Sequence, residues 1–446
     1  MAFYVKLFGS QEDCMEYLRS DDCLFPNVSY CQNENVVILK ENYRGKYLTF
    51  IPLESGTFSF STNDLQYSLD DGDTWQTLTA GQSTPVIPSY TKIMWKGENL
   101  TPTEADGIGT FSSTCNFKCI GNVMSLHFGD NFTSQVDLSG ENFAFKSLFQ
   151  SCNTIIDARN LVLPATTITE SCYRAFFNRC ENLEYGPEEL PALTAATDCY
   201  RTMFQLCTSL REAPILPATT LAERCYYFMF NSCESLKEAP ILPATTLANE
   251  CYQDMFRYTG LEEMPDLPAT VIPYCAYSFM FWGSKITQCK ELKIEVLGED
   301  ACYSMFRECN NLISGPTILP IKQMAFRSCG YMFQTCPNLT NLPQLPCTAL
   351  TDNCYIGMFR NCPSVTTAPV LPAKTLTTKC YNELFNNCTS LNHVKCLATD
   401  ISATGCLTSW LNNVSSTGTF VKDPNTTWPS GTAGIPAGWT VQDSAD

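Results

Sequence analysis

Apolar side chains recur at four-residue intervals through much of this chain. One clear stripe runs along residues 220–233, and its members are Leu221, Cys225, Met229 and Cys233, widened by Tyr226 and Phe230. Thr220 and Glu223 at its start have the spacing of a capping box, in which two side chains satisfy the free N–H groups of a helix start. The pattern therefore predicts a short helix with one buried face.

A short segment that contains prolines follows each stripe. Residues 236–243 carry apolar positions at Leu236, Ile241 and Leu242, but two prolines interrupt the run. Proline cannot donate to a β-ladder, so this segment is predicted to be briefly extended and not part of a regular sheet. The Ala-Thr-Thr phrase at 244–246 then turns the chain back into the next stripe.

The two halves form a unit that repeats about every 26 residues. Each unit opens at a lead cysteine, and most lead cysteines are followed by a phenylalanine and then by a second cysteine three residues further on. The lead cysteines are Cys172, Cys199, Cys225, Cys251, Cys275, Cys302, Cys329, Cys354, Cys380 and Cys406. One unit alone could not bury its stripe, whereas stacked units share a continuous core. We expect ten or eleven units over residues 141–415, and whether the irregular units at 256–297 have a function is left open.

Shorter alternating runs precede the array. Tyr47 to Ile51, Gly56 to Phe60 and Leu65 to Ser68 alternate apolar with polar residues between Gly, Pro, Asp and Asn. These runs predict a small all-β domain at 46–100, behind an N-terminal docking segment at 1–45. Residues 101–140 are expected to form a β-rich linker that caps the first unit, and 416–446 a C-terminal cap.

A motif that follows one of these runs resembles a pattern found in a class of enzymes. Residues 68–75, Ser-Leu-Asp-Asp-Gly-Asp-Thr-Trp, fit the Asp-box pattern found in sialidase-like glycosidases. A sialidase would carry several such boxes and an arginine cluster for the sugar carboxylate, and neither is present. We therefore interpret the motif as a hairpin turn, in which Asp and Gly form the turn and Trp75 packs beneath it.

The net charge and the lengths of the apolar runs argue against two classes of function. The 446 residues carry a formal net charge of −17, which argues against nucleic acid, whose binding proteins need Lys and Arg to displace counterions. No run approaches the ~18 apolar residues of a membrane span, so membrane insertion is not expected. No secretory signal is visible at Met1 to Phe8.

The 26 cysteines are predicted to be reduced structural thiols. Cys225 and Cys233 would lie roughly 12 Å apart on a helix, too far for a disulfide. Zinc is the alternative, but only two histidines exist and Cys115-x-x-x-Cys119 is a single weak match. We expect no metal and no cofactor.

The repeat resembles the BspA-like leucine-rich repeat family. Residues 175–180 stand in the place of the A-F-x-x-C phrase that the family carries on its convex side, and residues 210–217 stand in the place of its strand phrase, although the units here are two or three residues longer than the family's. The resemblance implies a leucine-rich-repeat-like α/β solenoid with short helices and short extended segments, here behind small β-rich N-terminal domains in a multi-domain chain. It implies partner binding, often at a cell surface, and no enzyme activity.

The ends of the chain are similar to segments of virion proteins of tailed phages of gut Bacteroidales. The matching segments are 26–31, the hairpin at 67–75, 107–113 and 435–441. This similarity implies a virion fibre or appendage, on head or tail, whose N-terminal region contacts other virion proteins and whose repeats face outward to a host surface protein or glycan. A homo-oligomer is expected, because fibres are usually symmetric assemblies.

Two other functions are weighed against the virion fibre, a cellular surface adhesin and an enzyme, and the adhesin is kept as the alternative. A bacterial or protozoan surface adhesin of the same repeat family would carry a signal peptide or a sorting tail. An enzyme would need a cleft with paired carboxylates, and the pairs Glu188-Glu189 and Glu262-Glu263 are better explained as solvated turns. We therefore expect no enzymatic activity.

The candidate binding surface is the strand side of the units. Its solvent-facing positions follow the leucine before each proline phrase, and they are Arg211, Glu212, Lys237, Glu238, Glu262, Glu263, Thr340, Asn341, Thr366 and Thr367. Aromatic side chains offer an apolar body with a polar tip, so three in the irregular units are added: Tyr258, Tyr274 and Trp282. For any single one of these residues, the alternative is ordinary solvated surface.

Overall fold

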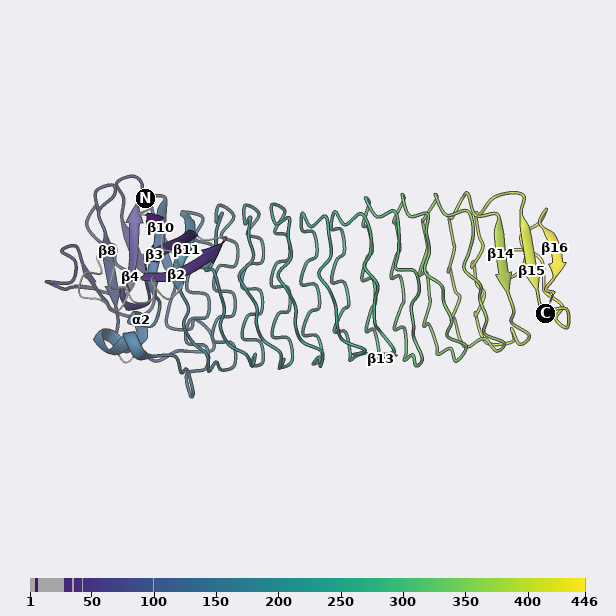
Figure 1. Cartoon of the computed structure of the whole chain (residues 1–446), viewed down its shortest axis with the longest axis horizontal. Helices are drawn as coiled ribbons and strands as arrows, with labels where there is room; N and C mark the ends of the chain where they lie inside the picture. Colours follow the sequence, from purple (N-terminus) through teal and green to yellow (C-terminus); the bar gives the residue numbers. More distant parts are fainter. Residues whose placement is uncertain (1–4, 7–27, 34–35, 42, 99, 446) are drawn as a thin grey trace.

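A computed structural model describes residues 5–6, 28–33, 36–41, 43–98 and 100–445 of the chain. The described part is elongated (Figure 1), with short sheets at the N-terminal end, a long series of coils lying side by side, and further short strands at the C-terminal end. Most of the predicted docking segment at 1–45 lies outside the described residues.

The strands of the N-terminal part form three sheets. Strands β1 (Val5–Lys6), β3 (Val36–Glu41) and β2 (Val28–Asn33) pair antiparallel in that order. A six-stranded sheet has the order β11 (Ile155–Val162), β10 (Phe117–Asn122), β4 (Leu48–Pro52), β8 (Ile93–Lys96), β6 (Leu65–Ser68) and β7 (Gln76–Leu78). Strands β5 (Phe58–Phe60) and β9 (Phe111–Ser113) form a two-stranded sheet.

An aromatic core holds this part together and joins it to the coils. Phe50 and Trp95 are fully buried, with ring centroids 5.5 Å apart. Phe111 stacks on Phe149 of the first coil at 5.6 Å. Strand β10 pairs antiparallel with β4 on one side and parallel with β11 on the other, so the sheet continues into the first coil.

The helical content of the described residues is small. It comprises α2 (Ser125–Phe128) and the 3-10 turns η1 (Tyr43–Gly45) and η2 (Gly129–Ser134). The short helix predicted for each unit is therefore wrong. In its place, each unit has a run of consecutive turns, which we call the turn run, and residues 171–180 are one example.

Hydrogen bonds explain how a turn run replaces a helix. The N–H groups of Arg174 and Asn178 donate to carbonyls three residues back, at 3.2 and 3.1 Å. The alternate N–H groups, such as those of Tyr173 and Ala175, donate to the next coil, at 3.0 and 2.9 Å. Every fourth residue has positive φ, as at Ser171, Ala175 and Arg179. The neighbouring coil thus supplies acceptors that an isolated helix would find within itself.

The other half of each unit is extended, as predicted, and we call it the extended segment. Neighbouring extended segments meet mainly through isolated parallel bridges, such as Tyr185 with Glu212 and Glu189 with Ile215. Strands β12 (Val271–Ile272) and β13 (Val296–Leu297) form a two-stranded parallel pair at the bend that leads into the turn run.

Between the two halves lies a core built from columns of identical side chains. One phenylalanine of each coil stacks on that of the next, with centroid distances of 5.3 to 5.7 Å along the column Phe149, Phe177, Phe204, Phe230, Phe256, Phe281, Phe306, Phe333, Phe359 and Phe385. A tyrosine column runs beside it from Tyr173 to Tyr277. The tyrosine column is interrupted where Cys302 and Cys329 stand four residues before Phe306 and Phe333.

The last coils lead into parallel strands at the C-terminal end. Strands β14 (His393–Cys396), β15 (Thr419–Lys422) and β16 (Thr440–Asp443) form a three-stranded sheet. Trp428 stacks on Trp410 at 5.6 Å, and the Trp439 indole N–H donates to the Ser415 carbonyl at 2.8 Å. At the coarsest level, the described chain is a β-rich fold with several separate sheets and very little helix.

Candidate functional site

Most of the predicted binding residues line the extended segments. Arg211, Lys237 and Glu262 are exposed and follow the buried leucine of their units, and the next residue in each unit is exposed as well. The bridges Tyr185–Glu212, Ser314–Asn341 and Thr367–His393 place residues of this second position beside their counterparts in the next coil. The residues therefore lie in two adjacent columns, which we call the extended face.

Side chains along these columns contact each other across coils. Lys237 Nζ lies 3.4 Å from Glu262 Oε1, and Arg211 Nε lies 3.4 Å from Glu184 Oε2. The Asn341 amide donates to Ser314 Oγ at 2.7 Å. Exposed ion pairs of this kind contribute little to stability. Their polar groups can therefore exchange partners with a ligand at small cost.

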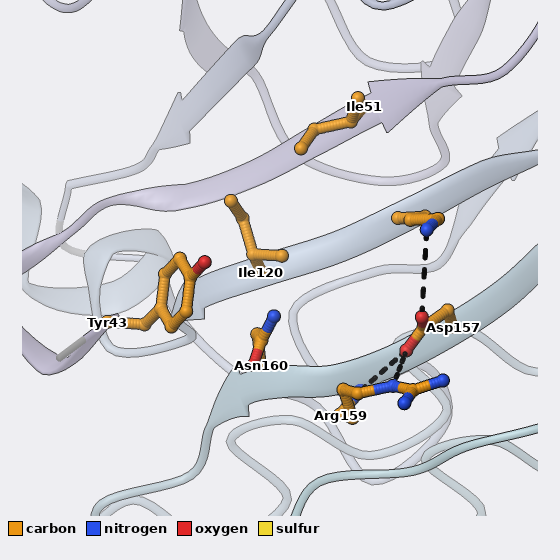
Figure 2. Close-up of a pocket in the computed structure, with 7 residues that line it drawn as sticks. Tyr43, Ile51, Ile120, Asp157, Arg159 and Asn160 are labelled. Atoms are coloured by element: carbon orange, nitrogen blue, oxygen red, sulfur yellow. Dashed lines mark hydrogen bonds and ion pairs between the residues drawn. The ribbon is translucent and has the colours of Figure 1, made fainter. Parts of the chain in front are cut away.

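Where the extended face begins, the N-terminal sheet forms a hollow of about 250 Å³ (Figure 2), which we call the sheet hollow. Among the described residues, its lining comes from η1, β4, β10 and β11, and the lining residues are Tyr43, Ile51, Lys118, Ile120, Asp157, Arg159 and Asn160. Ile51 and Ile120 are half-buried and form an apolar floor. None of these residues was predicted from the sequence.

Charged groups surround that floor. The Asp157 carboxylate accepts hydrogen bonds from Arg159 Nε at 3.0 Å and from the Arg159 backbone N–H at 3.1 Å. Lys118 Nζ lies 4.0 Å from the same carboxylate. The Arg159 guanidinium also lies 3.7 Å from the centroid of the Tyr185 ring, which belongs to the next coil. Two cations and one anion thus meet where the sheet passes into the coils.

The remaining predicted aromatics lie at the turn runs. Arg257 of the preceding coil lies 3.8 Å from the Trp282 ring centroid, and Arg307 of the following coil lies 4.6 Å from it. The Tyr258 ring is 6.0 Å from Trp282. Tyr258 and Tyr274 are 39% and 43% exposed, whereas Trp282 is half-buried. Guanidinium groups therefore occupy the position above the indole that a sugar would need.

The Asp-box segment forms the turn between β6 and β7. Asp70 accepts hydrogen bonds from Thr74 Oγ1 at 2.6 Å and from Ser68 Oγ at 2.7 Å. These bonds lower the pKa of Asp70 to about 2. Trp75 packs against Tyr47 at 5.0 Å, with Lys96 Nζ 4.3 Å from its ring. This arrangement agrees with the hairpin interpretation, since the polar groups of the motif bond to one another.

The thiols have the character of core residues. Every cysteine of the described side chains is free, and nearly all are buried. Burial raises the pKa of Cys172 and Cys302 to about 12. A thiol with so high a pKa is not a nucleophile at neutral pH. Within the described residues, no three His, Cys, Asp or Glu side chains are grouped as metal ligands would be.

Comparisons with known proteins give no relative. No protein-family model matches the chain, and no curated protein or solved structure matches it significantly. Across the described ranges, no helix has the length and apolar character needed to cross a membrane.

Proposed function

We propose that the protein is a non-enzymatic virion fibre or appendage protein whose coils form a leucine-rich-repeat-like solenoid for adhesion. In this proposal the N-terminal region contacts other virion proteins within a homo-oligomer, and the coils face outward to a host surface protein or glycan. The observation that carries the adhesive role is the extended face, where exposed polar side chains repeat in register from coil to coil. Arrays of this type offer extended binding surfaces.

The arrangement of the molecule supports separate roles for the N-terminal region and the coils. The sheets of the N-terminal part lie at one end of the described molecule, and the coils extend away from them (Figure 1), so the sheet end can attach while the coils project. The exposed ion pairs of the extended face are weakly held. Polar ligands such as glycans need partners of this kind.

Immunogold electron microscopy tests the virion assignment. An antibody raised against residues 141–415 is applied to phage-infected cultures of gut Bacteroidales, with pre-immune serum as the control. We expect gold on the particles, and its position distinguishes head from tail. Gold confined to cell envelopes, with bare particles, would contradict the proposal and favour a cellular surface adhesin.

A competition assay tests the extended face. The purified protein should reduce adsorption of particles to cells, and the charge swap Lys237→Glu with Glu262→Lys should weaken that competition. The matched control is the swap Lys322→Glu with Glu295→Lys, which reverses an exposed inter-coil ion pair of 2.8 Å in a different column. Equal competition by both swapped proteins would argue against the extended face as the adhesive surface.

A further inference from the structure

The sheet hollow differs in charge from the chain around it. Lys118 and Arg159 flank one carboxylate, that of Asp157, so the charged groups among the described residues of its lining sum to a single positive charge. The whole chain carries −17. A cationic site on an acidic protein attracts small anions while the remaining surface repels them. The ligand suited to this hollow is therefore an anion.

Arg159 is held in place before any ligand arrives. Asp157 fixes its Nε at 3.0 Å, and the Tyr185 ring supports its guanidinium plane at 3.7 Å. A guanidinium has five N–H donors in a fixed fork, and the hydrogen bond to Asp157 occupies the one at Nε. The fork suits a planar carboxylate, which Lys118 can assist as a point charge from β10. Holding the donors rigid reduces the entropy lost on binding.

The floor of the hollow calls for a ligand with an apolar face. Ile51 of β4 and Ile120 of β10 supply this floor, and the Tyr43 ring stands beside Ile120 (Figure 2). The space of about 250 Å³ is smaller than the pockets that hold drug-sized ligands. One sugar ring, which has an apolar face and polar edges, meets both requirements, and the Asn160 amide can bond to its hydroxyls.

A peptide is a poorer occupant than a sugar. An extended peptide binds a sheet by pairing with an open strand edge. Here β10 is bonded to β4 and β11 on its two sides. The far side of β11 is bonded to the next coil, where Ala158 N–H donates to the Tyr185 carbonyl at 2.7 Å. β10 therefore has no free edge, and the outer edge of β11 is already bonded at Ala158.

We propose that the sheet hollow binds an acidic monosaccharide unit of a glycan, with its carboxylate on Arg159 and Lys118 and its apolar ring face on Ile51 and Ile120. This inference rests on the proposed adhesive function and names the ligand class. It also places the first contact at the start of the extended face, because Asp157 forms an isolated bridge with Tyr185, the first residue of the second column. A longer glycan could continue from there along the coils.

The test uses the full chain and matched sugar pairs. Methyl glucuronide, methyl galacturonide and methyl mannuronide are each titrated beside the neutral methyl hexoside of the same ring, and binding is measured by saturation-transfer NMR and calorimetry. At least one uronide should bind at least about tenfold more tightly than its neutral partner. Arg159→Ala and Lys118→Ala should each weaken that uronide about tenfold and leave the neutral sugar unchanged.

Two controls separate binding from folding. Lys285→Ala removes an exposed cation far from the hollow in sequence and should leave uronide binding unchanged. Thermal unfolding of the Arg159 and Lys118 variants should match that of the parent chain, because both side chains are close to half exposed. The proposal is overturned if no uronide is preferred over its neutral partner, or if both alanine variants bind as well as the parent. Either result would leave the immunogold test of the virion assignment unaffected.

Discussion

At the scale of single residues, the second cysteine of each unit shows why sulfur is used in this core. Cys233 Sγ lies 3.1 Å from the Phe204 carbonyl of the preceding coil, and the same carbonyl accepts the Cys207 backbone N–H at 3.0 Å. A free cysteine is a small apolar residue with a weak S–H donor. It fills the space between coils and satisfies a second lone pair of a buried carbonyl, which alanine or leucine could not do.

Thiol reactivity follows from this placement. Because burial raises the pKa of Cys172 to about 12, only about one molecule in ten thousand would carry the thiolate at pH 8. We expect the native chain to react very slowly at Cys172 and Cys302 with a thiol reagent, and the urea-unfolded chain to react fully. Mass spectrometry after alkylation locates the modified sites. Rapid labelling of Cys172 in the native protein would contradict the buried column.

Substitution of one glycine in the turn runs tests how closely aromatic rings pack against the backbone there. Gly283 has φ +70°, and a Cβ there would overlap the Tyr258 ring. Gly283→Ala should therefore cost the ~1–2 kcal/mol of a left-handed alanine and a further ~1–3 kcal/mol of overpacking. Denaturant unfolding measures the difference from the parent chain.

Gly140→Ala is the matched control, because Gly140 also has positive φ but no atom lies within 4 Å of the added Cβ. It should cost the backbone part only. The double change Gly283→Ala with Tyr258→Ala should lose the overpacking part, since the ring is gone. Equal destabilisation by Gly140→Ala and Gly283→Ala would show that the ring is not in the way.

At the scale of the element, the turn run marks what the sequence pattern could and could not predict. The four-residue stripe of Cys225, Met229 and Cys233 correctly identified the buried side. An α-helix turns every 3.6 residues, so a repeat of four was the available hint that the segment is not helical. The alternate hydrogen bonds to the next coil could not be predicted from one unit, because they arise only when units stack.

The turn runs also contain a buried carboxyl that makes stability depend on pH. The Asp254 side chain is 2% exposed and lies 3.1 Å from Arg257. Burial raises its pKa from 3.8 to about 6, although Arg257 opposes the shift. Between these values the folded chain keeps a proton that the unfolded chain loses, so this residue's contribution to stability falls as pH rises from about 4 to about 6 and is constant above that.

Asp254→Asn should remove this pH dependence. The free energy of unfolding of the parent minus that of the variant should decrease by about 2.4 kcal/mol between pH 4 and pH 7. Taking the difference cancels the other carboxyl groups, which the two proteins share. Urea unfolding at several pH values measures it, and a difference that stays flat would contradict the raised pKa.

At the scale of the whole molecule, the sequence predicted the periodic part better than the sites. The lead cysteines repeat in the sequence because most coils bury side chains of the same kind. The sheet hollow could not be found in this way, since Ile51, Lys118 and Arg159 are far apart in sequence and meet only through the pairing of β4, β10 and β11. The spacing of residues along the sequence does not predict contacts between residues so far apart in it.

The strictness of the repeat leads to a prediction about the whole array. Tyr226 stacks on Tyr200 at 5.6 Å and on Tyr252 at 5.7 Å, so the coils on either side of this unit present nearly identical surfaces to it. Deletion of residues 221–246 joins Thr220 to Leu247 and removes one full 26-residue period. Because each coil contacts only its neighbours, the shortened chain should fold with Tyr200 stacked on Tyr252, and should melt cooperatively within a few degrees of the parent.

Deletion of residues 221–233 is the control, since it removes a turn run and leaves an extended segment without its partner, and this chain should melt much lower or aggregate. Circular dichroism melting and size-exclusion chromatography compare the two, and similar damage in both would mean that the coils are not interchangeable.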